Sequence, residues 1–267
     1  MEHDFTSGSV WKKLLLFAVP IFGANLLQAL YGTVDLFVVG LFADASAVSA
    51  VSTGSMTMQT ITGIITGLTM GCTVLLGQNI GKKDEAAAER TVGSALWLFV
   101  TVGILLAVIV AVLAVGIASV INALAEAFSQ TTDYIRICGI GIICIVMFNA
   151  IGGMFRGLGD ARTPLALMGV ACVVNIAGDF ALVGALKMGV AGAALATVAV
   201  QGILSTFLVR IPVSYAMSKV SGVTLFQIGF ATPLATVFGL ILSASCVIYY
   251  ERKRKKHKMI GKTAKMY

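Results

Sequence analysis

Two aspartates interrupt long apolar stretches of the sequence. Asp35 follows the charge-free run Leu14–Val34, and Asp179 follows the run Thr163–Gly178. A charged side chain inside a bilayer is costly, and it usually faces a cavity or a partner. Asp35 and Asp179 are therefore the first candidates for a functional site.

Further polar side chains on the same predicted helices reach a similar depth. Counted from outer helix ends expected near residues 43, 186 and 188 at 1.5 Å per residue, Asp35 lies about 12 Å deep, Asp179 about 11 Å and Thr197 about 14 Å. Tyr31 and Asn175 each precede one of the aspartates by four residues, so they share its helix face. Such an oxygen-rich cluster could bind a proton or a hard cation such as Na⁺. In the alternative interpretation, the two carboxylates reach the outer interface and only fix helix ends.

The composition predicts that these residues lie in an all-α, polytopic membrane protein. The chain of 267 residues is 58% hydrophobic and 12% charged, whereas soluble domains carry roughly 25% charged residues. Most of its nearly charge-free stretches approach or exceed the roughly 20 apolar residues that a membrane helix needs. We therefore expect about six to seven transmembrane helices, the first of them uncleaved, from the stretches Leu14–Val34, Ala45–Gly81, Thr91–Ala125, Ile137–Phe155, Thr163–Gly178, Met188–Val209 and Val220–Tyr250.

The basic residues predict a topology and no nucleic-acid partner. The net charge is +7, and residues 251–267 alone hold eight Lys and Arg against Glu251. A basic run beside a membrane helix indicates a topology anchor or a contact with anionic lipid. The positive-inside rule places the N-terminus and the basic loops in the cytoplasm through six helices. A seventh span, Val223–Tyr250, would leave the basic tail outside, which contradicts the rule.

The sequence contains no recognisable enzyme motif. His3 and His257 lie in the flanks, and no HExxH, GxSxG, P-loop or GxGxxG pattern occurs. The five cysteines lie in apolar stretches without CxxC spacing, so we expect small buried side chains and no disulfide framework. We therefore expect a protein that is not an enzyme and binds no cofactor.

Two glycine patterns predict structure and not chemistry. Gly63, Gly67 and Gly71 recur every four residues, as do Gly77 and Gly81, which predicts a bare helix face against which a neighbouring helix packs. The run Gly157-Leu158-Gly159-Asp160 lacks the third glycine of a phosphate loop, so we expect a tight cytoplasmic turn.

Several motifs, taken together and in order, resemble the multidrug and toxic compound extrusion (MATE) family of transporters. The resemblance covers about residues 10–197, which are similar to the N-terminal six-helix lobe of a twelve-helix transporter. The matching residues are Val19-Pro20, Tyr31, Val34-Asp35, Gly40, Gly77-Gln78-Asn79-Ile80-Gly81 with Arg90, Phe155-Arg156-Gly157-Leu158-Gly159-Asp160-Ala161-Arg162-Thr163-Pro164, Asn175 to Asp179, and Gly192-Ala193-Ala194-Leu195-Ala196-Thr197.

The resemblance implies a function and a site. Family members export cationic, amphipathic drugs or dyes across the bacterial-type plasma (inner) membrane, driven by inward flow of H⁺ or Na⁺. The implied cation site consists of Tyr31, Asp35, Asn175, Asp179 and Thr197, the group that the depth argument assembles. The coupling ion would be the only bound ion, with no further metal.

The remainder of the chain departs from the family pattern. From about residue 201 it resembles the last two helices of such a transporter, which suggests an internally deleted member. We therefore predict a six-helix lobe over 1–200, a remnant over 201–250 and a basic cytoplasmic tail over 251–267. A homodimer could restore two lobes. One rival is an inactive or regulatory remnant that acts as a membrane binding module. Another is a seven-helix receptor or a light-driven pump, but a retinal pump needs a lysine that Val223–Tyr250 lacks.

Overall fold

The computed structural model describes residues 10–200 and 202, all within one compact unit, Met1–Val209. The predictions for the stretch Val220–Tyr250 and for the basic tail fall outside the described residues.

Helices make up the described part of the chain, which contains no strand, so the all-α prediction is confirmed. This is the expected result for an apolar chain, because a helix satisfies every backbone N–H and C=O within one segment in lipid. The elements are α1 (Val10–Phe42), α2 (Ala45–Gly81), α3 (Glu85–Val120), α4 (Phe128–Ile140), α5 (Ile142–Gly157), α6 (Arg162–Asp179), the π-helix η1 (Phe180–Ala185) and a short helix Val190–Val200.

Four described helices are long and apolar enough to cross a membrane, and the bent pair α4–α5 brings the number to five. These five correspond to the first five predicted stretches. Of the sixth, Met188–Val209, the structure describes the apolar helix Val190–Val200, which is shorter than a span. The chain is thus a multi-pass membrane protein.

The fourth predicted span differs from the structure. The sequence predicted one helix over Ile137–Phe155, whereas the structure begins at Phe128 and bends by 53° between α4 and α5. A Cβ at Gly141, between the two helices, would lie only 2.2 Å from Cγ1 of Val198. The bend therefore lies where the short helix Val190–Val200 packs directly on bare backbone.

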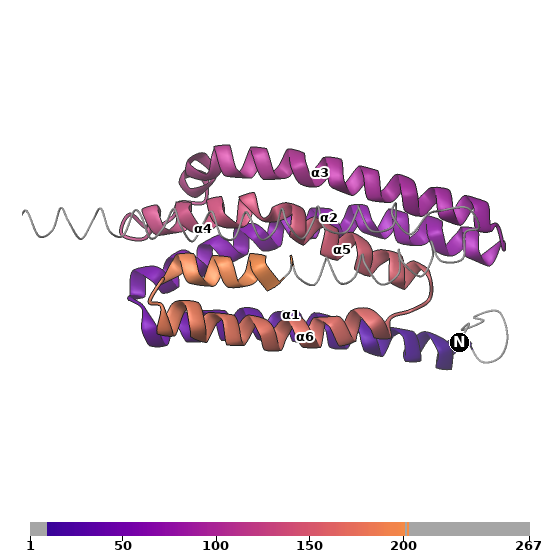
Figure 1. Cartoon of the computed structure of the whole chain (residues 1–267), viewed down its shortest axis with the longest axis horizontal. Coiled ribbons are helices and arrows are strands. Elements are labelled where there is room, and N and C mark those ends of the chain that lie inside the picture. The colour runs from indigo at the N-terminus through magenta and orange to yellow at the C-terminus, as the bar shows by residue number, and fades with distance from the viewer. Residues whose placement is uncertain (1–9, 201, 203–267) are drawn as a thin grey trace, which may run out of the picture. The chain divides into compact units, whose positions relative to one another are not determined.

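The helices form two groups with the candidate site between them. α1 packs mainly on α6, while α3 packs on α4 and α5, and α2 packs on the same two helices from another side (Figure 1). Figure 1 also shows the start of α1, the α2–α3 turn and the α5–α6 turn at one end of the unit. The basic residues of these segments, including Lys12, Lys82 and Arg156, therefore lie at one end of the unit, which agrees with a common membrane side.

The turn between α5 and α6 is fixed by Asp160. Gly159 has a φ of +82°, a left-handed conformation that glycine adopts without strain. Partial burial acts to raise the pKa of the Asp160 carboxyl, but hydrogen bonds from the Thr163 hydroxyl and from the backbone N–H groups of Thr163 and Arg162 outweigh it, so this pKa is lowered from 3.8. The segment is thus a tight turn that starts α6.

Among the predicted glycines of α2, Gly77 lies against another described helix, because a Cβ there would lie 3.6 Å from the Gly157 carbonyl oxygen at the end of α5. No described atom lies within 4 Å of a Cβ built at the other predicted glycines, which are Gly63, Gly67, Gly71 and Gly81. The helix contact predicted for these four glycines is therefore wrong within the described chain. α2 and α5 also contact each other where the Thr73 hydroxyl donates to the Gly153 carbonyl at 2.9 Å. Glycine spacing identifies a bare face, but it does not say what the face meets.

Gly153→Ala should destabilise the protein, because a Cβ there would lie 2.1 Å from Cγ2 of Thr69 and 2.9 Å from Oγ1 of Thr73. Overpacking of this kind costs about 1–3 kcal/mol. The matched control is Gly116→Ala on α3, where a Cβ meets no described atom within 4 Å. Thermal unfolding of detergent-purified protein measures both variants, and an unchanged midpoint for Gly153→Ala would contradict the packing described.

Candidate functional site

The two predicted carboxyl groups lie together in the interior. Asp35 on α1 is 5% exposed, and Asp179 at the end of α6 is 0% exposed. Their side chains are close enough to interact directly. The Thr197 hydroxyl lies 3.4 Å from Oδ2 of Asp35 and 3.2 Å from the Ala193 carbonyl, so it is shared between the two acceptors.

Most polar atoms of this group lack a hydrogen-bond partner. Among the described residues, no partner reaches Oδ1 of Asp35, either carboxyl oxygen of Asp179, or either side-chain polar atom of Asn175. Leaving a buried polar group unsatisfied costs about 1–3 kcal/mol, and more for a charged group. The site therefore has oxygens available for a ligand that accepts their lone pairs, which is a proton or a cation.

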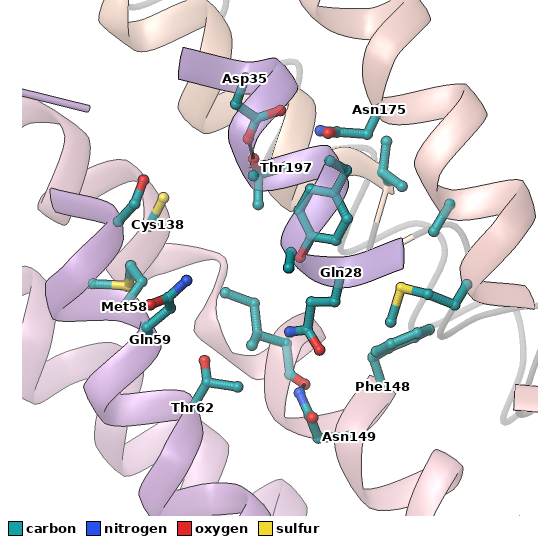
Figure 2. A pocket seen from close by; sticks show the side chains of 18 of the residues that line it. Gln28, Asp35, Met58, Gln59, Thr62, Cys138, Phe148, Asn149, Asn175 and Thr197 are labelled. Atoms are coloured by element: carbon teal, nitrogen blue, oxygen red, sulfur yellow. Dashed lines mark hydrogen bonds between the residues drawn. The ribbon is translucent and has the colours of Figure 1, made fainter. Parts of the chain in front are cut away.

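The structure brings the five predicted site residues to one place. Tyr31, Asp35, Asn175 and Thr197 line a common cavity, and the buried Asp179 interacts with Asp35 without being among the lining residues. Figure 2 shows the side chains of Asp35, Thr197 and Asn175 on the same side of this cavity. The grouping expected from helical depth is present, while the role of the residues as a cation site stays a prediction.

An irregular backbone segment begins at Asp179. The helix α6 ends there and continues as the π-helix η1, so a depth counted at the α-helical rise does not hold between residues 179 and 186. Turns of this type occur frequently at functional sites. The Phe180 ring packs edge-on against Phe42, with 6.1 Å between ring centroids, and a Cβ at Gly184 would also touch Phe42. The π-helix thus connects Asp179 to the end of α1.

The cavity has a volume of about 430 Å³ and continues well beyond the carboxyl groups. This volume lies in the range of roughly 300–1,000 Å³ that is usual for small-molecule sites. Apolar side chains of Met58, Phe148 and Met168 share its lining with neutral amides and hydroxyls. Figure 2 shows Gln28, Gln59, Thr62 and Asn149 around its lower part.

The charge of the cavity favours a cation. No lysine, arginine or histidine is among the described lining residues, whereas Asp35 reaches it directly. Within the described chain, no group of three or more His, Cys, Asp or Glu side chains could hold a metal ion. The described lining, which is acidic and has no basic side chain, therefore suits a cationic ligand.

The sequence interpretation missed Tyr134, Ser55 and Cys138, which also line the cavity. Tyr134 is 3% exposed, and its hydroxyl is 3.0 Å from Oγ of Ser55. The fourth span was predicted to start at residue 137, which placed Tyr134 in a loop. The available signal was the spacing of four residues between Tyr134 and Cys138, which sets both on one face once the helix begins at Phe128.

A sequence profile of the MatE family matches residues 20–181 of the chain. Among curated proteins, the chain is 29% identical over 201 residues to the probable multidrug resistance protein YpnP of Bacillus subtilis, covering 75% of this chain and 45% of that protein. It is 31% identical over 205 residues to YoeA of the same organism, another probable multidrug resistance protein, covering 75% and 44%. The chain therefore spans less than half the length of these relatives.

The fold is also similar to solved structures. A transporter of the MOP superfamily from Pyrococcus furiosus superimposes with a TM-score of 0.73 at 23% identity, over 90% of this chain and 53% of the other. At this identity the likeness concerns the fold alone. It extends over nearly all of the present chain and about half of the larger protein.

The hydrogen bond between Ser55 and Tyr134 should show as a coupling in stability. Ser55→Ala leaves a buried phenol without its partner, which costs about 1–3 kcal/mol, and adding Tyr134→Phe removes that phenol. The double variant should thus lose less stability than the two single variants combined. Thr57→Ala is the control, because its hydroxyl bonds only the Thr53 carbonyl of its own helix. Thermal unfolding in detergent measures the stability of the wild type, the two single variants and the double variant. Additive losses for the Ser55 and Tyr134 variants would contradict the hydrogen bond between them.

Proposed function

The chain belongs to the MatE family, and we propose that it exports cationic, amphipathic compounds across a bacterial-type plasma (inner) membrane in exchange for H⁺ or Na⁺. The observation that carries the proposal is the buried pair Asp35 and Asp179, with unpaired oxygens beside a cavity whose described lining has no basic side chain. Because the chain spans less than half the length of its relatives, we base the proposed activity on this site and not on the names of the relatives.

Asp35 is the main coupling carboxylate in this proposal, and Asp179 is its partner. Two negative charges at close range in a medium of low dielectric repel strongly, so one proton or Na⁺ between them stabilises the pair. Tyr31, Asn175 and Thr197 supply further oxygens around it. Departure of the ion leaves the cavity more negative, and an organic cation then binds in its place.

The cavity walls support an amphipathic substrate. Met58, Phe148 and Met168 offer apolar surface, and methionine adapts its shape to different ligands because its side chain is unbranched and polarizable. The amides of Gln28 and Asn149 can hydrogen-bond the polar parts of a ligand without adding charge. This combination favours broad recognition over the selection of one compound.

Exchange requires the site to have two states with different affinities for the ion and the drug. We propose that ion binding shifts α1 between two packings against α6, with Pro20 inside α1 as the point of bending. The N-terminus would be cytoplasmic, on the side of the basic turns. A folded chain that exports nothing would favour the second candidate function, a membrane binding module. The observation that supports this candidate is that the chain covers only 45% of the length of its relative YpnP.

Asp35→Asn should abolish export, because an amide cannot exchange a proton and holds a cation weakly. The measurement is accumulation of a fluorescent cationic dye in pump-deficient bacteria that express the wild-type chain, the variant or an empty vector. The wild type should lower dye accumulation, and Asp35→Asn should return it to the empty-vector level at equal abundance in the membrane.

The matched control is Asp44→Asn, since Asp44 is exposed at the start of α2 and its side chain makes no capping hydrogen bond. This variant should export dye as the wild type does. Undiminished export by Asp35→Asn would refute the assignment of Asp35 to the coupling site. Equal dye accumulation in all strains would favour the binding module.

The coupling ion should be identifiable in everted membrane vesicles. A protonophore abolishes dye uptake if H⁺ drives exchange, whereas removal of the Na⁺ gradient abolishes it if Na⁺ does. Uptake that survives the loss of both gradients would contradict exchange by this site.

A further inference from the structure

Exposed polar side chains lie near the middle of two membrane helices and line the open side of the cavity. Asn25 lies near the centre of α1, and Gln59 and Thr66 lie near the centre of α2, and all three are exposed. An amide that faces hydrocarbon at this depth is costly. The middle of α3 contrasts with this, because its exposed side chains, such as Leu105, are apolar apart from Thr101, whose hydroxyl donates to the Trp97 carbonyl of its own helix. α3 can therefore face lipid, but this part of α1 and α2 requires a polar or protein environment.

Beyond Gln59, the same face of α2 carries three glycines without side chains. Gln59, Gly63, Gly67 and Gly71 follow one another at intervals of four residues, and no described atom lies within 4 Å of a Cβ built at the three glycines. Gly32 on α1 is equally open. A bare face in a membrane helix lets another helix approach closely. We call this surface the mouth face, and it consists of Asn25, Ala29, Gly32, Gln59, Gly63, Thr66, Gly67 and Gly71.

The cavity of the candidate site opens onto the mouth face. Every exposed residue among its described lining belongs to this face, and the remaining lining residues are buried or half-buried. The exposed ones are Asn25, Ala29, Gln59, Gly63 and Thr66. In a bilayer the opening would lead sideways into lipid, which cannot solvate the unpaired Asn175 that lines the cavity. A second protein surface must therefore close it.

We propose that the mouth face binds the mouth face of a second copy of this chain. Two copies inserted with the same orientation meet across a twofold axis along the membrane normal, which places the same patch on both sides. The mouth face carries no charged residue, so the two patches meet without repulsion. The two cavities then join into one closed chamber with a carboxyl pair on each side.

The length of the chain supports a second copy as the partner of the mouth face. The chain covers 45% of the relative YpnP and 53% of one similar solved structure, so two copies amount to about the length of one such protein. The inference deepens the proposed function, because it supplies the second wall of the chamber in which the drug binds. It does not depend on which ion drives exchange.

Cysteine cross-linking in native membranes tests the contact directly. In the full chain with its five cysteines replaced by alanine, Gly63→Cys, Gly67→Cys and Gly71→Cys should each shift the chain from monomer to disulfide-linked dimer upon mild oxidation. The controls are Gly93→Cys and Gly116→Cys on α3, which are equally exposed and open. They should stay monomeric.

A second measurement uses the chain with its own cysteines. Two differently tagged copies should co-purify from membranes, Gly67→Trp should abolish this because the ring fills the mouth face, and Gly116→Trp should leave it unchanged. Co-purification needs no transport, so a dimer that exports no dye would refute the proposed function and leave the inference standing. Dye export by a chain that neither cross-links nor co-purifies would refute the inference of a dimer and leave the proposed function standing.

Three results would overturn the inference. The first is that no cysteine variant of the mouth face forms a cross-linked dimer although the protein is inserted in the membrane. The second is equal cross-linking at the α3 controls. The third is closure of the mouth face by another segment of the same chain, which would protect Gly67→Cys from thiol reagents without forming a dimer.

Discussion

Two carboxyl groups that lipid cannot solvate impose the main constraint on this structure. Asp35 and Asp179 are almost fully buried, and three of their four oxygens have no described hydrogen-bond partner. A membrane protein tolerates this where the groups adjoin a cavity that admits an ion. The separation of the α1–α6 pair from α2, α4 and α5 provides that cavity.

The irregular backbone of the chain lies around the same cavity. η1 begins at Asp179, and the α4–α5 bend lies at Gly141, against Val198 of the helix that also carries Thr197. Departures from α-helical geometry are tolerated in a membrane where protein or a cavity surrounds them. Since both departures adjoin elements of the site, a change in ion occupancy can act on helix packing without breaking regular helices in lipid.

A depth count from helix length and rise put Asp35 and Thr197, which lie on separate helices, at one level of the bilayer, whereas the count for Asp179 ran through the π-helix η1, where the α-helical rise does not hold. Tyr134 was missed because charged neighbours, Asp133 and Arg136, made the start of α4 resemble a loop. Most of the predicted glycines of α2 were misinterpreted for another reason. Their spacing defines a bare face, but whether that face meets a helix of the same chain depends on tertiary packing, which periodicity does not contain.

We propose that Asp35 and Asp179 link ion binding to drug binding. Such coupling is reciprocal: if drug binding displaces the ion, a high ion concentration must weaken drug binding by the same factor. The most direct measurement is ion release when a cationic dye binds to the purified protein, followed with a pH indicator or radioactive Na⁺. We expect release of H⁺ or Na⁺ upon dye binding, with no release from Asp35→Asn. Dye binding that releases neither ion and does not vary with pH or Na⁺ concentration would contradict the proposal.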